Sequence, residues 1–213
     1  MMAALIRKTF SVPPLGCNCS IIGDPVTKQA VIIDPGGAPE RILQEVQQLG
    51  LTVSHILHTH AHLDHFLASS EIKKATGAAI CLHQDDLQLW NNLELQCRVF
   101  GVSYVPALAP DHWLTDEEKV MLGQVPIVAL HTPGHTPGSM SFHVPNDQLL
   151  LAGDTLFRGS IGRTDLWGGN FEMIEASIRE RLYTLDEATT VVTGHGPDTE
   201  IGLEKESNQF VRV

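Results

Sequence analysis

Residues 57–65 read Leu-His-Thr-His-Ala-His-Leu-Asp-His and place three histidines and an aspartate within six positions: His60, His62, Asp64 and His65. Imidazole nitrogens and carboxylate oxygens are ligands for zinc and for other first-row metals. Buried together without a cation, these side chains would carry a large desolvation cost. The stretch therefore predicts a metal site rather than a group of ordinary structural histidines.

The predicted metal-binding stretch, residues 60–65, lies between a predicted strand and a predicted helix. An apolar run at 53–57 is typical of a buried strand, and the helical pattern at 65–76 ends at Gly77. A short turn between two such elements lets side chains two residues apart converge on one point. His58 lies at the end of the predicted strand, outside the alternating pattern of metal-ligand residues that follows it. We therefore interpret it as a strand-end histidine and not as a ligand.

Length, composition and charge limit the classes of protein to which the chain can belong. With 213 residues, 43% of them hydrophobic, we expect a single domain over residues 1–213 with a well-filled core. The formal net charge of −11 argues against nucleic acid as a partner, because phosphate binding needs a positive surface. It argues equally against an anionic membrane surface. We expect a small-molecule substrate, and the oligomeric state is left open.

Two further features bear on the compartment. Residues 1–8 lack an apolar segment long enough for a signal peptide, and no apolar run approaches the roughly 20 residues of a membrane helix. The four cysteines are scattered, and the first two are too close for an ordinary disulfide: Cys17, Cys19, Cys81 and Cys97. We therefore expect reduced thiols and a cytoplasmic location.

The residues before the predicted metal-binding stretch indicate three consecutive antiparallel strands at 5–12, 18–23 and 30–34. A helix is predicted at 39–49, because its apolar residues fall on one face. Asp34 ends the third strand, and we interpret it as a turn-capping aspartate in preference to a ligand.

Residues 84–113 follow a predicted strand at 78–82 and have a less regular pattern. Residues 87–93 are compatible with a short helix, and aromatic residues and prolines then gather in an expected loop at 100–113. This segment is either a lid over the site or a packed surface segment without a role in function, and the sequence is compatible with both.

The second half of the chain again predicts strands followed by helices. The predicted elements are strands at 125–130, 139–144, 149–152 and 190–193 and helices at 171–182 and 199–210. Asn170 is the expected N-cap of the first of these helices, which should bury Phe171, Ile174, Ile178 and Leu182.

Three of these strands end in residues that can bind metal. His135 is surrounded by two prolines and two glycines, Asp154 follows Gly153, and His195 lies between two glycines. His131 is interpreted as structural. Several strands that each deliver a ligand to one edge predict a single composite site.

That site contains seven candidate ligands: His60, His62, Asp64, His65, His135, Asp154 and His195. One zinc ion takes about four ligands, so seven suit two metals roughly 3.5–4 Å apart. The chemistry of the ligands is compatible with zinc, iron or manganese, and we expect Zn²⁺ first.

Order and spacing of these motifs resemble the metallo-β-lactamase superfamily. The matching segments are the HxHxDH motif at 60–65, Pro-Gly-His at 133–135, Gly-Asp-Thr at 153–155 and Gly-His-Gly at 194–196. The resemblance implies an α/β fold, an αββα sandwich of two mixed sheets flanked by helices. It also implies that His60, His62 and His135 hold one metal, that Asp64, His65 and His195 hold the second, and that Asp154 bridges them.

Within that superfamily the chain looks like the short, single-domain glyoxalase II-like proteins. Segments 153–157 and 162–165 carry this likeness. Full-length glyoxalase II enzymes have an added helical domain that helps to bind glutathione, and the present sequence has no counterpart to it. The hydrolytic centre is therefore implied more directly than the glutathione part of the substrate.

The resemblance implies thioester hydrolysis of S-D-lactoylglutathione or a related acyl thioester. A metal-bridging hydroxide attacks the carbonyl, with Asp64 and Asp154 as the catalytic carboxylates. A thiolate leaves without a strong acid, because a thiol pKa is about 8.5. Arg163 either binds the acid end of the substrate or forms an ion pair with Asp165.

Two other functions are compatible with parts of the pattern. Segment 162–165 also looks like persulfide dioxygenases of the same superfamily, in which one iron would be held by His60, His135 and Asp154. Against this, all positions for a second metal are filled. A non-catalytic scaffold is disfavoured, since such a relative is expected to have lost ligands.

Overall fold

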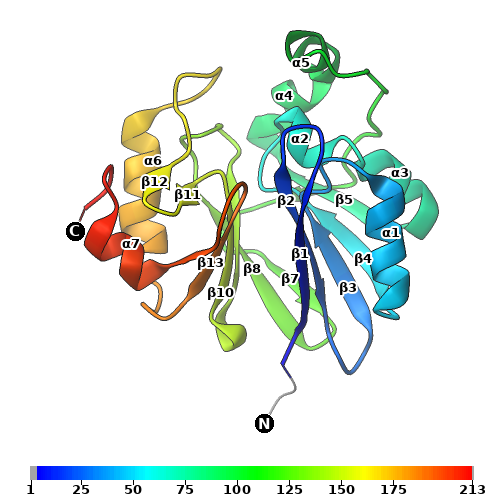
Figure 1. The fold of residues 1–213 in the computed structure, drawn as a ribbon, viewed down its shortest axis with the longest axis horizontal. Helices are drawn as coiled ribbons and strands as arrows, with labels where there is room; N and C mark the ends of the chain where they lie inside the picture. The colour runs from blue at the N-terminus through cyan, green and yellow to red at the C-terminus, as the bar shows by residue number, and fades with distance from the viewer. Residues whose placement is uncertain (1–3, 213) are drawn as a thin grey trace. The chain divides into compact units, whose positions relative to one another are not determined.

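The computed structural model describes residues 4–212 and divides into two units, each built around its own sheet (Figure 1). Of the described residues, unit 1 comprises 4–114 and 121–125, and unit 2 comprises 115–120 and 126–212. The expectation of a single domain stays a prediction. No helix among residues 4–212 is long and apolar enough to cross a membrane.

The sheet of unit 1 has six strands in the order of the chain, from β1 to β6. They are β1 (Ile6–Val12), β2 (Cys17–Gly23), β3 (Gln29–Ile33), β4 (Thr52–Leu57), β5 (Ala79–His83) and β6 (His112–Leu114). The first three pair antiparallel, as predicted, whereas β3 to β6 pair parallel. The sheet is therefore mixed, and β3, β4 and β5 have their carboxyl ends at the same edge.

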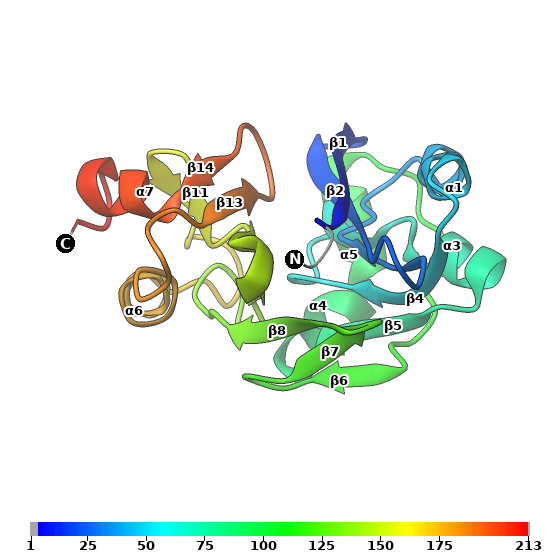
Figure 2. The ribbon, with the colours of Figure 1, turned by 90° about the horizontal axis from the view of Figure 1, so that it is seen from below.

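The helices of unit 1 are α1 (Pro39–Gln48), α2 (Leu63–Phe66), α3 (Ser69–Thr76), the 3₁₀ turn η1 (Gln84–Asp86), α4 (Leu87–Asn91) and α5 (Leu93–Phe100). α1 and α3 contact each other beside the sheet, with Ile42 and Ile72 fully buried against it (Figure 2). The four cysteines are free and buried, which agrees with the expectation of reduced thiols.

Two predictions about these helices are wrong in detail. The single helix expected at 65–76 is two helices, because the amide of Ala68 donates to the carbonyl of Pro35 (3.0 Å) instead of continuing the ladder of α2. The irregular segment expected at 84–113 is helical as far as Phe100, and Trp113 lies in β6 rather than in a loop.

The second sheet has six strands in the order β14-β13-β10-β9-β8-β7. It belongs to unit 2 except for Met121–Val125, which include the end of β7 and the first residue of β8 and belong to unit 1. Unit 2 also contains a separate two-stranded hairpin. The strands are β7 (Lys119–Leu122), β8 (Val125–His131), β9 (Met140–Val144), β10 (Leu149–Gly153), β13 (Thr190–Thr193) and β14 (Thr199–Glu200), and the hairpin is β11 (Leu156–Phe157) with β12 (Ser160–Ile161). The helices are the 3₁₀ turn η2 (Pro145–Asp147), α6 (Phe171–Ser177), which continues into a π-helical turn (Ile178–Leu182), and α7 (Ile201–Ser207).

The helices of unit 2 follow the predicted pattern with two corrections. Asn170 caps α6 by accepting from the amide of Met173 (3.0 Å), as expected. Phe171, however, is 46% exposed, so the buried face begins at Ile174. The terminal helix is shorter than expected, because residues 199–200 pair with β13 as a strand.

Strand direction in the second sheet explains how its functional residues meet. β9 is antiparallel to both β8 and β10, and β13 is parallel to β10. β8, β10 and β13 therefore run in one direction, and their carboxyl ends lie at the same edge of the sheet. His135, Asp154 and His195 follow these three ends.

Candidate metal centre

The connection between β4 and α2 brings the four predicted ligands of unit 1 together. The rings of His60 and His62 have centroids 4.8 Å apart, and those of His60 and His65 are 4.0 Å apart. His65 Nε2 lies 3.7 Å from Asp64 Oδ2. Three of the four side chains are buried, and His62 is half-buried.

Asp34 holds His65 in place. Its Oδ2 accepts from Nδ1 of His65 at 3.0 Å and from the hydroxyl of Thr59 at 2.6 Å, while Oδ1 accepts from the Thr59 amide at 2.8 Å. Histidines that bind a metal commonly donate a hydrogen bond from their second ring nitrogen to a carboxylate, which fixes the tautomer and the ring orientation. The turn-capping interpretation of Asp34 is therefore wrong: its side chain orients His65, a predicted ligand in α2.

The same carboxyl group also orients His60, through Thr59. Because the Thr59 hydroxyl donates to Asp34, it accepts from Nδ1 of His60 at 3.0 Å. His60 therefore carries its proton on Nδ1 and its lone pair on Nε2. One buried aspartate thus sets the tautomer of two predicted ligands.

The thiol of Cys17 also contacts His65. Its Sγ lies 3.4 Å from His65 Nδ1. Burial raises the pKa of this thiol to about 12, so it stays protonated at neutral pH. Cys17 therefore packs against the ligand as a neutral group.

Unit 2 brings the other three predicted ligands together around Asp154. Its Oδ2 lies 3.6 Å from His135 Nε2 and 3.8 Å from His195 Nε2. Nδ1 of His135 donates to the carbonyl of Arg163 at 2.8 Å, which leaves Nε2 as the nitrogen that faces Asp154. The two histidines therefore present the same ring nitrogen to one carboxylate.

Gly194 allows the backbone to lie this close to Asp154. A Cβ atom at position 194 would lie 1.9 Å from Asp154 Oδ1. A side chain at that position would displace the carboxylate. The Gly-His-Gly motif therefore makes room for Asp154 as well as presenting His195.

Two histidines near these clusters have structural contacts, as interpreted from the sequence. His58 is buried, with Nδ1 2.9 Å from the Cys81 carbonyl and Nε2 2.7 Å from the Ser69 hydroxyl. Burial lowers the pKa of His58 to about 4, so it is neutral. His131 Nε2 lies 2.9 Å from the Pro137 carbonyl.

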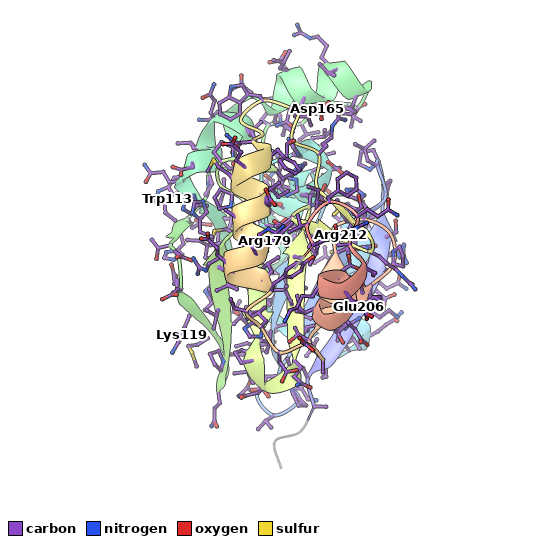
Figure 3. All side chains as sticks on the ribbon, turned by 90° about the vertical axis from the view of Figure 1, so that its left-hand side faces the viewer. Trp113, Lys119, Asp165, Arg179, Glu206 and Arg212 are labelled. Carbon is purple, nitrogen blue, oxygen red and sulfur yellow. The ribbon has the colours of Figure 1, made fainter. Side chains whose placement is uncertain are left out.

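Arg163 forms an ion pair with Asp165 in the structure. Its Nε and Nη2 each donate to a carboxylate oxygen of Asp165 at 2.7 Å. The guanidinium lowers the pKa of Asp165 to about 2. Both side chains are more than half exposed, and Figure 3 shows Asp165 on the loop before α6. The pair is therefore accessible, and an incoming carboxylate would compete with Asp165.

The carbonyl that orients His135 belongs to a loop that follows the β11–β12 hairpin, and α7 holds this hairpin. The carboxyl group of Glu204 is fully buried and accepts from the backbone amide of Gly159 (2.9 Å), the Thr199 hydroxyl (2.6 Å) and the side-chain amide of Asn208 (2.7 Å). Asn208 also donates to the Ser160 carbonyl at 3.0 Å. Nothing in the sequence pattern singled out these two residues.

We expect Glu204→Ala to lower the free energy of unfolding by about 2–4 kcal/mol, because it leaves buried donors without an acceptor. Glu206→Ala is the matched control, since Glu206 lies exposed on the same helix (Figure 3) and should change stability by less than about 0.5 kcal/mol. Urea unfolding of both variants checks this, and equal midpoints would contradict the assigned role.

The residues of both clusters fit divalent metal ions. Each cluster combines imidazole nitrogens with a carboxylate, and three of the histidines have a defined second-nitrogen partner that leaves Nε2 for a ligand bond. This donor set suits zinc as well as iron, so it does not select one metal.

The chain is similar to known proteins over most of its length. A model of the metallo-beta-lactamase superfamily matches residues 12–195. Hydroxyacylglutathione hydrolase GloC of Haemophilus influenzae is 40% identical over 196 residues, which cover 91% of this chain and 92% of that protein.

Three solved structures are similar over most of the chain. BLEG-1 B3 metallo-beta-lactamase has a TM-score of 0.90 at 36% identity, and the aligned region covers 97% of this chain and 99% of that chain. TTHA1623 in a di-iron-bound form has a TM-score of 0.88 at 36% identity, with coverage of 96% and 100%. ETHE1 from Myxococcus xanthus has a TM-score of 0.78 at 30% identity, with coverage of 96% and 83%.

The similarity to these structures confirms the predicted α/β fold class, the αββα sandwich of two mixed sheets flanked by helices. All seven predicted ligands lie within the matched residues 12–195. Because the family model matches most of the chain and a relative is 40% identical over 91% of it, the chain belongs to the metallo-beta-lactamase superfamily.

Proposed function

We propose that the protein is a binuclear metallohydrolase that cleaves acyl thioesters, with S-D-lactoylglutathione as the first candidate substrate. The proposed first site is His60, His62 and His135, the second is Asp64, His65 and His195, and Asp154 bridges them. The observation that carries the proposal is that each unit gathers its ligand-type side chains into one cluster with oriented rings. The 40% identity to hydroxyacylglutathione hydrolase GloC supports the thioester.

Residues of the chain account for much of the proposed chemistry. Two bound divalent ions would supply hydroxide at neutral pH and polarise the thioester carbonyl. Asp64 lies 3.7 Å from His65 Nε2 and is buried, which suits a ligand better than a proton donor. A thiolate leaving group needs no strong acid, because its pKa is about 8.5. This active site therefore suits a thioester better than an amide.

The first test is the metal content of the purified protein, followed by an assay with S-D-lactoylglutathione. About two zinc or iron ions per chain together with thioester cleavage are expected. Two ions without cleavage would reject the thioester and retain the binuclear centre. Iron is a specific alternative to zinc, because the related TTHA1623 is known in a di-iron-bound form.

A second candidate is a persulfide dioxygenase with a single iron held by His60, His135 and Asp154. The likeness of segment 162–165 to persulfide dioxygenases favours it. Oxygen consumption with glutathione persulfide and one iron per chain would establish this activity and reject the hydrolase.

The proposed setting is a reducing compartment, the cytoplasm, with a small molecule as the partner. The four cysteines are free and buried, which supports reduced thiols. The net charge of −11 is unfavourable for nucleic acid.

Arg163 is proposed to bind the acid end of the substrate. We expect Arg163→Ala to raise KM roughly 10- to 100-fold with a smaller effect on kcat, as for the loss of a charge-assisted hydrogen bond. Arg158→Ala is the control, because Arg158 is an exposed arginine on the nearby β11–β12 hairpin. Steady-state kinetics of both variants test this. An unchanged KM in Arg163→Ala would leave only the ion pair with Asp165 as its role.

A further inference from the structure

The segment from η1 to α5, residues 84–100, contacts the backbone of the ligand loop of unit 1. Asp86 is fully buried, and its Oδ2 accepts from the amide of Ala61 at 2.8 Å. Gln96 on α5 accepts from the amide of Leu63 at 2.9 Å and donates to the carbonyl of Ala61 at 3.1 Å. Two side chains thus bind three backbone groups of the loop.

These backbone groups lie between the predicted ligands. Ala61 separates His60 from His62, and Leu63 separates His62 from Asp64. The loop follows the end of β4, where the sheet no longer supplies hydrogen bonds, and buried backbone groups need partners. Leu63 is also the first residue of α2, and His62, the residue before it, makes no side-chain cap. Gln96 therefore takes the place of an N-cap.

The segment that carries Asp86 and Gln96 is itself fixed in unit 1. Gln96 Nε2 also donates to the carbonyl of Leu89 at 2.9 Å, which joins α5 to α4. Trp90 stacks on Phe66 of α2 with ring centroids 4.1 Å apart, and its indole donates to the Leu108 carbonyl at 3.1 Å. Figure 1 shows α4 and α5 beside α2 at one end of the sheet of unit 1.

We propose that Gln96 and Asp86 are positioning residues that set the spacing of His60, His62 and Asp64 for metal binding. Residues 84–100, the first part of the segment at 84–113, are thus a fixed support of the ligand loop, rather than part of the lid or of the packed segment without a role that the sequence left open. The inference rests on the proposed metal centre, but it does not depend on the substrate.

The test measures metal affinity of the full-length protein by competition with a chromophoric chelator, using zinc alone as the probe. We expect Gln96→Leu to weaken zinc binding roughly 10- to 100-fold, as is typical when a residue that orients metal ligands is removed. Gln88→Leu makes the same change at an exposed position of α4 and should bind zinc like the wild type. Excess zinc should bring Gln96→Leu to the zinc content of the wild type, which a general loss of fold would not allow.

Gln96→Glu and Asp86→Ala keep the proposal testable if Gln96→Leu does not fold. Gln96→Glu keeps the acceptor for Leu63 and loses the donor to Ala61, so we expect an intermediate zinc affinity. Asp86→Ala should also weaken zinc binding. Wild-type zinc affinity in folded Gln96→Leu or, where that variant does not fold, in folded Gln96→Glu and Asp86→Ala would overturn the proposal. Failure of the wild type itself to bind zinc or iron would instead reject the proposed function.

Discussion

Asp154→Ala should lower the proposed thioester hydrolysis by about a thousandfold or more and reduce the metal content from the proposed two ions per chain to one or none. In unit 2, Asp154 Oδ2 lies 3.6 Å from His135 Nε2 and 3.8 Å from His195 Nε2, so its removal takes away the group that both histidines face. The proposed bridging role makes it a ligand to both metals. Metal-ion catalysis contributes several kcal/mol to transition-state stabilisation, and about 4 kcal/mol corresponds to a thousandfold.

The measurements are elemental analysis and steady-state kinetics of the purified variant. Asp147→Ala is a control for the change in charge, because Asp147 is exposed and precedes β10, whereas Asp154 follows the other end of that strand. We expect Asp147→Ala to keep both metal content and activity. If Asp154→Ala retained two ions and full turnover, the assignment of a bridging ligand would be wrong.

Gly194→Ala should lower both the free energy of unfolding and the metal content, although position 194 is not itself a ligand. Its Cβ would lie 1.9 Å from Asp154 Oδ1 and 2.9 Å from the Gly153 carbonyl carbon. The backbone at Gly194 cannot easily move away from Asp154, because the Gly194 amide donates to the Gly153 carbonyl at 2.7 Å. Overpacking of this kind typically lowers the free energy of unfolding by about 1–3 kcal/mol. Displacement of the Asp154 carboxylate should weaken metal binding as well.

Gly50→Ala separates this effect from a general penalty on replacing glycine. Gly50 has a φ of +65°, but a Cβ there would meet nothing within 4 Å. We expect a loss of about 1 kcal/mol from the left-handed backbone and no change in metal content. Thermal unfolding and elemental analysis of both variants make the comparison. Equal metal content in Gly194→Ala and Gly50→Ala would show that the close approach to Asp154 does not matter.

Much of the fold and the candidate site could be predicted from the sequence, because local periodicity encodes an element and its end. Alternating apolar runs placed the strands, and Asn170 marked the beginning of α6. The residues at strand ends were then visible as ligand types in a fixed order, which was sufficient to predict the members of each cluster. The predicted helix at 65–76 failed for a reason that lies outside its own sequence: the amide of Ala68 binds the carbonyl of Pro35 on another segment.

The sequence by itself determined which residues are candidate metal ligands and which strands they follow. Only the tertiary structure decided what holds those residues in place. Asp34 reaches His65 because β3 is the neighbour of β4, and Gln96 reaches Ala61 because α5 packs beside α2. Glu204 reaches the amide of Gly159 from a helix 45 positions further along the chain. A local pattern records the period of one element, whereas these hydrogen bonds depend on which elements become neighbours, and packing of the whole chain sets that order.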